Sequence, residues 1–282
     1  MKRYLKLVGI TTIVLPFQLV TLAQNNSERV VVNWRDSSRP GTLDLNSNFG
    51  SVTVTAFAGK DVVIEARPTA NSASRGGRGG RGGRGNRGGR ADAATDAGLI
   101  RFPKPLEITA DERNNVITLA LPADAVDLNI QVPVRTNLKV NKVGSGAVTI
   151  QGVDGDLEIS TAAGPIRLID VAGSVVAHSM AGDIIASLTR VTPDRPMAFT
   201  AFAGSVDVTL PATIKANVIL ANHQGSVTTD FDVQQRSVRV PAGVGNLGAG
   251  TSEPSIRGTL NGGGPDVELR SFAGSLYLRK RK

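Results

Sequence analysis

Apolar and polar residues alternate in short stretches along most of the chain, and glycine separates the stretches. In the centre, glycines recur every nine residues from Gly146 to Gly182, and apolar or small residues follow each one at the second and fourth positions. Because successive side chains of a strand point to opposite faces, these two positions share one face. The pattern therefore predicts a repeating unit of one short strand and one glycine turn.

One such unit has too little apolar surface to fold alone, so successive units are expected to stack around a shared core. Glycine adopts positive φ angles at low cost and suits a tight corner. Two nine-residue units would make one turn of a flattened, two-sided coil. We therefore predict an all-β, single-domain β-solenoid of short strands with no significant helix. The glycines assigned to its repeat are Gly50, Gly146, Gly155, Gly164, Gly173, Gly182, Gly204, Gly225 and Gly274.

Three phenylalanines and one histidine occupy a shared position in this repeat. Phe57, Phe202 and Phe272 each lie two residues before a glycine, and His223 lies two before Gly225. Other units carry Val153, Ala162, Val171 or Met180 at that position, so we interpret it as inward-facing. The sequence therefore predicts that the three phenylalanines pack in the core and do not stack on a ligand, and that His223 packs in the core or at its rim.

The chain divides into five predicted segments. Residues 1–23 read as a signal peptide, because Lys2, Arg3 and Lys6 precede an apolar stretch over 7–20 that is followed by small residues. That stretch is shorter than the roughly 20 residues a membrane span needs. Residues 24–67 are predicted as a first β segment, 68–98 as a disordered insertion, 99–279 as the solenoid body and 280–282 as a basic tail. Export to the periplasm, the outer surface or the medium follows from the signal peptide.

The predicted insertion is dominated by arginine and glycine. Its arginines recur every third residue, at Arg75, Arg78, Arg81, Arg84, Arg87 and Arg90. With nothing apolar to bury, this stretch cannot form a core. The formal charge of +8 comes largely from this segment, the signal peptide and the C-terminus, which leaves the predicted body with a net negative charge.

Three interpretations of the arginine–glycine segment stay open. Such segments bind single-stranded nucleic acid through charge and arginine stacking, but the export signal disfavours that partner. Anionic glycans or lipid head groups outside the cell are the candidate partners if the segment binds at all. A solvated loop with no binding role is the third interpretation.

Residues for metal or covalent chemistry are scarce. The chain has no Cys, which excludes disulfides and thiolate ligands. Its two histidines, His178 and His223, fall in distant units, and His178 is expected to be exposed. Acidic corner residues such as Asp154, Asp156 and Glu158 lack the regular spacing of calcium-binding repeats. We therefore expect no cofactor and no metal site.

One enzymatic alternative remains open, a polysaccharide lyase or hydrolase on a β-helix. It would require Asp183 to stack with Asp207, Asp230 and Asp232 in a groove. Short corners and few aromatic residues disfavour such a groove. The chain is accordingly predicted not to be an enzyme, with no catalytic residue assigned.

Several motifs match a known family in their order along the chain. Strands beginning near Pro122 and Pro133 lead into the Gly-x-Val-x-Ile array, which is followed by Gly-Ser-Val-Asp-Val-Thr-Leu-Pro over 204–211, Gly-Ser-Val at 225 and Gly-Ser-Leu-Tyr-Leu at 274. Over most of 28–65 and 105–279, the chain resembles the bacterial "putative adhesin" family, domain of unknown function 4097. The resemblance implies a right-handed β-solenoid at the cell envelope with no assigned catalytic residues. An adhesin-like or envelope-associated binding protein with an unidentified surface ligand or envelope protein partner is therefore expected.

Overall fold

The computed structural model describes residues 27–69, 108–121, 126–235 and 255–282. Every secondary-structure element in these ranges is a β-strand, and they contain no helix. The predicted all-β class is thereby confirmed. The predicted signal peptide and residues 70–98 of the predicted insertion lie outside the described residues, whereas Pro68 ends a strand.

The strands form two ladders, and most neighbours within a ladder run parallel. Beginning at the N-terminal end of the stack, the first ladder contains β5 (Thr109–Arg113), β6 (Val116–Ala120), β2 (Gly41–Ser47), β8 (Thr136–Lys142), β10 (Asp154–Ala163), β11 (Ile166–Ala181), β13 (Met197–Ala203), β19 (Asp266–Ala273), β15 (Ala216–Gln224), β18 (Ser255–Leu260) and β17 (Gln234–Gln235).

The second ladder faces the first across the core. In the same direction it contains β1 (Glu28–Asn33), β4 (Asp61–Pro68), β7 (Val126–Pro133), β3 (Val52–Phe57), β9 (Val148–Gln151), the start of β11, β12 (Ile184–Val191), β14 (Val206–Pro211), β20 (Leu276–Arg281) and β16 (Val227–Thr229). Strand β11 belongs to both ladders, because its first residues pair with β9 and its last ten include the partners of β10. Lys280 and Arg281 of the predicted basic tail belong to β20 and its pairing with β14.

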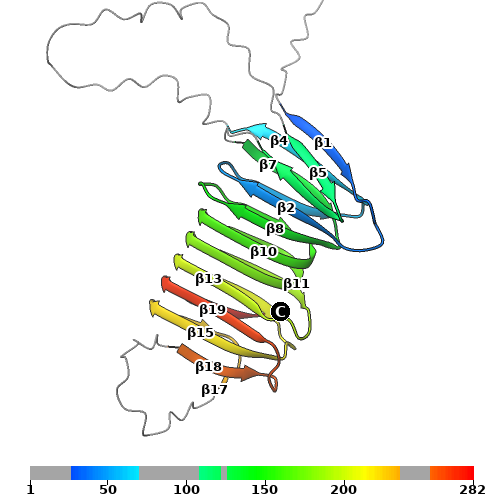
Figure 1. Cartoon of the computed structure of the whole chain (residues 1–282). Helices are drawn as coiled ribbons and strands as arrows, with labels where there is room; N and C mark the ends of the chain where they lie inside the picture. Colours follow the sequence, from blue (N-terminus) through cyan, green and yellow to red (C-terminus); the bar gives the residue numbers. More distant parts are fainter. Residues whose placement is uncertain (1–26, 70–107, 122–125, 236–254) are drawn as a thin grey trace, which may run out of the picture.

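Each turn of the chain supplies one strand to each ladder. The chain passes from β8 to β9, from β10 into β11 and from β13 to β14, and each of these strands pairs in parallel with its counterparts in adjacent turns. Figure 1 shows the strands of the first ladder stacked one above another along an elongated body. The predicted strand-and-turn unit is therefore present, with two units per turn.

The order of turns in space differs from their order in the sequence at both ends. The first turn, β2 and β3, lies between the turn of β6 and β7 and the turn of β8 and β9. The last turn, β19 and β20, lies between the turn of β13 and β14 and the turn of β15 and β16. Figure 1 shows β19 in this inserted position between β13 and β15. Only the middle turns stack in the order of the chain.

Antiparallel strands end the parallel stack. At the N-terminal end, β5 pairs with β6 and β4 pairs with β7, while β1 adds to β4. At the other end, β18 pairs with β15 and β17 with β18. These antiparallel strands cover the outer edges of β6, β7 and β15, whose backbone groups would otherwise be unpaired, which is one way that proteins manage sheet edges.

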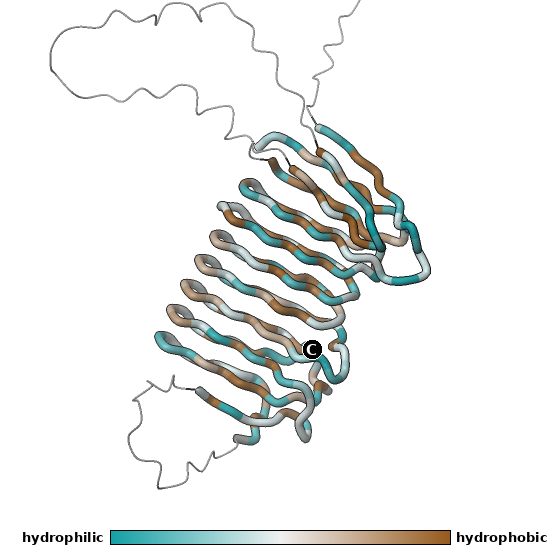
Figure 2. The backbone as a smooth tube through the Cα atoms, in the orientation of Figure 1, coloured by the Kyte–Doolittle hydropathy of each residue, from teal (hydrophilic) through white to brown (hydrophobic). Residues whose placement is uncertain are grey.

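The core lies between the two ladders. Figure 2 shows hydrophobic and hydrophilic residues alternating along the stacked strands, and the inward residues form rows that continue from turn to turn. One such row contains Leu45, Val140, Ile159, Ala177 and Phe199, all at most 1% exposed. Each strand buries its aliphatic face, as the alternation predicts.

Candidate binding surfaces

Seven of the nine repeat glycines line one corner of the stack, where the chain passes from the first ladder to the second. We call it the glycine corner, and in spatial order its members are Gly50, Gly146, Gly164, Gly182, Gly204, Gly274 and Gly225. A Cβ atom on Gly164 would lie 2.2 Å from the carbonyl oxygen of Gly146. Gly164 also has a φ of 109°, so a side chain would be strained as well as crowded. Gly155 and Gly173 pair with each other at the opposite corner.

A row of buried polar side chains runs beneath the glycine corner. It contains Ser47, Lys142, Thr161, Ser179, Ser271 and Asn222, each at most 7% exposed, and Ala201 takes the place between Ser179 and Ser271. Several bond to carbonyl oxygens of the corner. Lys142 Nζ donates to Gly144 O at 2.9 Å and Ser145 O at 2.5 Å, and Ser271 Oγ donates to Gly204 O at 2.8 Å. Burial lowers the pKa of Lys142, an effect partly opposed by the charge of Asp127.

The outward neighbours of this buried row form an exposed aromatic row. The ring of Phe202 stacks on that of Phe272 with centroids 4.9 Å apart, and Phe272 stacks on His223 at 4.6 Å. Phe202 is 56% exposed and Phe272 41%, and Met180, which continues the row at the next turn, is 65% exposed. We call Phe202, Phe272 and His223 the aromatic row.

The prediction that Phe202 and Phe272 are core residues is therefore wrong, and His223, predicted in the core or at its rim, is exposed and stacks on Phe272 outside the core. In β13 the buried side chains are those of Met197, Phe199 and Ala201, so Phe202 has the outward phase. The corresponding position at the opposite corner points inward, since Val153 and Val171 are fully buried. The sequence comparison merged these two corners.

Phe57 is also predicted to lie in the core, and His178 is predicted to be exposed. Phe57 is half-buried, with its ring against Gly59, where an added Cβ atom would meet it. His178 is exposed, as expected. Neither residue belongs to the aromatic row.

A row of hydroxyl groups lies on the other side of the glycine corner. Ser205, Ser275 and Ser226 directly follow corner glycines, and we call them the serine row. Ser205 Oγ accepts the Ser275 N–H at 3.2 Å, and Ser275 Oγ accepts the Ser226 N–H at 3.3 Å and the Ser226 hydroxyl at 3.2 Å. Asp183 continues the row and accepts the Ser205 N–H at 2.8 Å. Since a hydroxyl can also donate, the Ser205 and Ser275 O–H groups remain available to a ligand.

The carboxylates named for the enzymatic alternative do not form one cluster. Asp207 pairs across strands with Ile185, which places it two residues along from Asp183. Asp207 binds Arg279 through both oxygens at 2.8 and 3.1 Å, and this bond raises the Arg279 pKa, with a further contribution from the charge of Asp230. Arg279 thus interacts with both acids. Within the described part of the chain, no three His, Asp or Glu side chains gather as they would around a metal ion.

Other acidic corner residues are also held in ion pairs between turns. Asp154 lies 2.6 Å from Arg190, Asp156 lies 2.8 Å from Arg195, and Asp170 lies 2.8 Å from Arg281 of β20. All are at least one-third exposed, so each contributes little to stability. Each of these three carboxylates therefore already has an arginine as its cationic partner.

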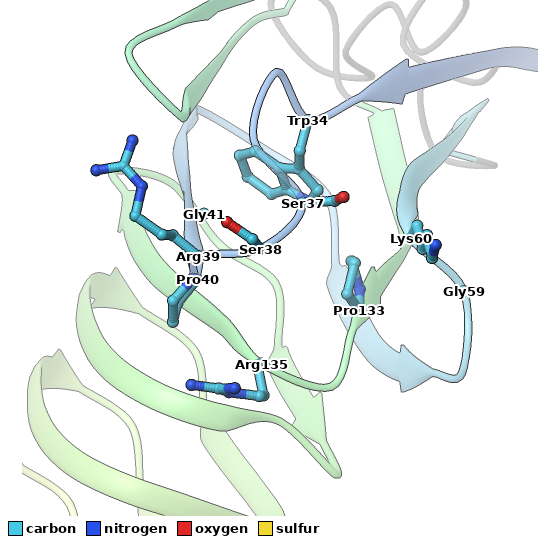
Figure 3. Close-up of a pocket in the computed structure, with 10 residues that line it drawn as sticks. All are labelled: Trp34, Ser37, Ser38, Arg39, Pro40, Gly41, Gly59, Lys60, Pro133 and Arg135. Atoms are coloured by element: carbon cyan, nitrogen blue, oxygen red, sulfur yellow. The ribbon is translucent and has the colours of Figure 1, made fainter.

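A small pocket lies near the N-terminal end, beside the turn between β1 and β2. Figure 3 shows Trp34, Pro40 and Pro133 around it, with Lys60 on one side and the Arg135 guanidinium pointing outward. Its volume is about 100 Å³, below the range of pockets that hold small organic ligands. Within this loop, hydrogen bonds from Ser38 and Arg39 lower the pKa of Asp36 to about 2.

A larger hollow lies where three chain-breaking segments meet. Residues 192–194, 211–215 and 263–265 contribute to its lining, and its volume is about 480 Å³. The sequence marks each of these segments as a turn but gives no sign that they converge. The charged lining residues Arg190, Asp194 and Lys215 are all exposed, so the hollow offers no buried charge that would orient a ligand.

One predicted binding segment lies outside the described residues. The six arginines of the insertion are not among them, so their candidate role in binding polyanions stays a prediction. In the described residues, no helix has the length and apolar character needed to span a membrane.

The solved structures that are similar to this chain include two proteins whose names refer to adhesion. One is a putative cell adhesion protein from Clostridium sporogenes, with 11% identity, 90% of this chain and 99% of that chain covered, and a TM-score of 0.44. The other is a putative adhesin from Bacteroides fragilis, with 12% identity, 90% and 97% coverage, and a TM-score of 0.37. No family model and no curated protein matches the chain. Because both TM-scores are below 0.5, these two similarities do not indicate a function for the chain. The surface of the chain itself is the basis for the function proposed below.

Proposed function

We propose that the chain is an exported, non-enzymatic binding protein of the cell envelope with an adhesin-like role. We further propose that its stack is a right-handed β-solenoid of the domain of unknown function 4097 type, on the motifs described above. The observation that carries the binding role is the exposed row of Met180, Phe202 and Phe272 on the outside of the stack. Soluble proteins seldom leave several large apolar side chains together on the surface unless something binds there.

The arrangement of the acidic groups supports the non-enzymatic part of the proposal. Hydrolysis of a glycosidic bond by general acid and base catalysis uses two carboxyl groups that flank that bond. Asp207 is instead bonded to Arg279, and Asp183 accepts a backbone N–H. A hydrolase acting through Asp207 would require that carboxylate to be released from Arg279. If the enzymatic alternative is right, the purified chain will depolymerise polygalacturonate, and Asp207→Asn will abolish that turnover.

The binding role can be tested with beads coated with the chain from Gln24 onward. We expect the beads to be retained on at least one surface of a panel of immobilised neutral and acidic polysaccharides and phospholipid bilayers. We also expect the protein in its native host to be found outside the inner membrane with Gln24 as its first residue. Failure of coated beads to attach to any surface, with the protein retained in the cytoplasm, would contradict the proposal.

The arginine–glycine segment is tested in the same assay by deleting residues 75–90. If it binds polyanions, the deletion will reduce retention on acidic polysaccharides or anionic bilayers, and added salt will reduce the retention of the intact chain. Unchanged retention after the deletion would favour the solvated loop.

A further inference from the structure

We propose that the glycine corner of the C-terminal half binds a linear neutral glycan, with sugar rings on the aromatic row and sugar hydroxyls on the serine row. This inference rests on the proposed function, because it names the ligand class of that surface. It is carried by the stacked, exposed rings of Phe202, Phe272 and His223 and by the hydroxyl groups of Ser205 and Ser275 beside the same corner.

The aromatic row offers ring surface to a ligand. The planes of Phe202 and Phe272 differ by only 4°, yet their centroids are 4.9 Å apart. Phe272 lies between Phe202 and His223, and its plane is within 7° of both, so its two faces are turned toward its neighbours. A ligand therefore meets the exposed edges of the stacked rings, which form with Met180 at the open end an apolar strip against which the C–H groups of a sugar can pack.

The serine row offers the hydrogen-bonding groups that a sugar requires. Ser205 and Ser275 use their oxygens to accept backbone N–H groups, which fixes their positions and leaves their O–H groups to donate. Asp183 accepts one N–H through Oδ1, and its second oxygen can accept from a sugar hydroxyl. The glycine corner therefore has hydrogen-bond donors and an acceptor on one side and the apolar row on the other.

The repeat distance of the rows favours a chain-like ligand. Adjacent strands of a ladder are about 4.8 Å apart, and the ring centroids of the aromatic row are 4.9 and 4.6 Å apart. Extended β-linked hexoses repeat at a closely similar distance, so successive sugars would meet successive turns. Because successive sugars of such a chain are turned over relative to one another, a glycan lying along the corner would repeat its contacts at every second turn.

The charge of the two rows indicates a neutral glycan. Neither row contains a lysine or arginine, Asp183 adds a negative charge, and Arg270 beside the aromatic row is ion-paired with Glu268. An acidic polysaccharide or an anionic lipid surface would be repelled by that carboxylate. The proposal therefore differs from the polyanion partners considered for the arginine–glycine segment, and the two can be tested separately.

The width of the apolar row disfavours a protein partner. Stable protein interfaces bury about 800 Å² on each side and involve some 20–30 residues. The aromatic row is one side chain wide, with glycines and serines on one side of it and the polar residues His178, Thr200 and Arg270 on the other. This geometry matches a ligand that is a single chain wide.

The direct test is calorimetric titration of the chain from Gln24 onward with cellohexaose and N-acetylchitohexaose, two neutral β-1,4-linked probes. We expect at least one to bind, with affinity rising from the dimer to the tetramer as more turns are engaged. The double variant Phe202→Ala and Phe272→Ala should weaken binding by about tenfold or more, which corresponds to about 1.4 kcal/mol. Phe202→Trp should retain binding, because an apolar aromatic ring is kept at that position.

A matched control is Phe49→Ala, which removes an exposed phenylalanine, 49% accessible, at the other end of the stack. It should leave the affinity unchanged. Thermal unfolding of both variants establishes that they are folded. Ser205→Ala with Ser275→Ala should weaken binding as well, by less than the loss of the rings.

The inference is overturned if neither neutral probe binds, or if one binds with equal affinity to the double variant. It is also overturned if only oligogalacturonate or phosphatidylglycerol vesicles bind at the aromatic row. Beads that still attach to a surface in any of these cases would leave the binding role intact while removing the neutral glycan. If a neutral probe binds but the protein stays in the cytoplasm of its host, the glycan site is supported and the proposed role at the cell envelope is contradicted.

Discussion

The middle of the stack and its two ends are built from the same kind of turn but differ in how the turns are ordered. From β8 to β12, each turn lies on the one before it in the sequence. At the ends, the first turn and the last turn are each inserted between two others. The comparison shows that a turn of this fold is accepted wherever its inward face fits, regardless of its place in the chain.

Insertion changes how the ends depend on the rest of the molecule. The middle turns can form by adding one neighbour at a time, as repeat proteins do. The last turn instead joins strands whose sequence positions differ by up to 70 residues, as in the pairing of Val206 with Leu276. The C-terminal part of the stack is therefore expected to fold as one unit and to fail as one unit.

The largest effect is expected when the inserted turn is removed by ending the chain at residue 265. The cut removes the buried side chains Val267, Leu269, Leu276 and Leu278 from between two other turns. Typical domains are stable by only about 5–15 kcal/mol, so we expect the C-terminal part to lose its cooperative fold. Urea unfolding followed by circular dichroism, together with limited proteolysis, would measure this.

The control for that truncation is deletion of β1, an edge strand paired only with β4 among the described strands. Its loss exposes one side of one strand, and the protein should still unfold in a single transition at a lower urea concentration. If the chain ending at 265 unfolds as cooperatively as the chain without β1, the inserted turn does not hold the C-terminal part together.

A second prediction compares two phenylalanines on one strand. Phe199 is fully buried and Phe202 is 56% exposed, three residues further along β13. Phe199→Ala should reduce the free energy of unfolding by about 3–5 kcal/mol through cavity formation. Phe202→Ala should change it by no more than about 0.5 kcal/mol. Equal losses in chemical denaturation would mean that Phe202 also contributes to the core.

A third prediction compares two glycines with positive φ in the C-terminal part. A Cβ atom on Gly274 would lie 2.1 Å from Gly204 O, whereas one on Gly262 would meet nothing within 4 Å. Gly274→Ala should therefore lower the unfolding free energy by about 2 kcal/mol or more, and Gly262→Ala by about 1 kcal/mol, the cost of its φ of 93° alone. Thermal unfolding would separate the two, and similar losses would show that the contact at the glycine corner is relieved by a backbone shift.

The strands and the core could be predicted because burial acts on each turn separately. Val148 and Ile150 follow Gly146 at the second and fourth positions, and both are fully buried in β9. The order of the turns could not be predicted in the same way. Leu276 and Leu278 present the same inward face as Val206 and Val208, so alternation alone cannot tell which turn is the neighbour of which.

The candidate site was missed because nine residues make only half a turn. Glycines nine apart alternate between two corners, so Met180 and Val171 were compared although one points outward and the other inward. Comparing positions 18 residues apart would have grouped Ala162 with Met180, and Val153 with Val171. The first pair, Ala162 and Met180, differs in size and type, whereas Val153 and Val171 are both valine. This difference in uniformity is the sequence feature that separates an outer row from a core row. The arginine–glycine segment carries no such signal, and its role stays a prediction.

The smallest expected effect concerns Lys142, the buried lysine at the N-terminal end of the glycine corner. Burial lowers its pKa below the ordinary 10.5, so the unfolded chain binds this proton more tightly than the folded chain does. Stability should therefore rise with pH from the folded pKa up to about pH 10.5. Below that window the charged lysine is retained through its bonds to Gly144 O and Ser145 O.

Lys142→Met should remove this rise, because the methionine has no proton to lose. The matched control is Lys139→Met, which removes an exposed lysine from the same strand and should keep the rise. Urea unfolding at a series of pH values up to about 10.5 measures the slope for each protein. Equal slopes in the wild type and Lys142→Met would show that Lys142 reaches water in the folded state. The polar row beneath the glycine corner would then be hydrated at its N-terminal end, unlike the aliphatic rows on either side of it.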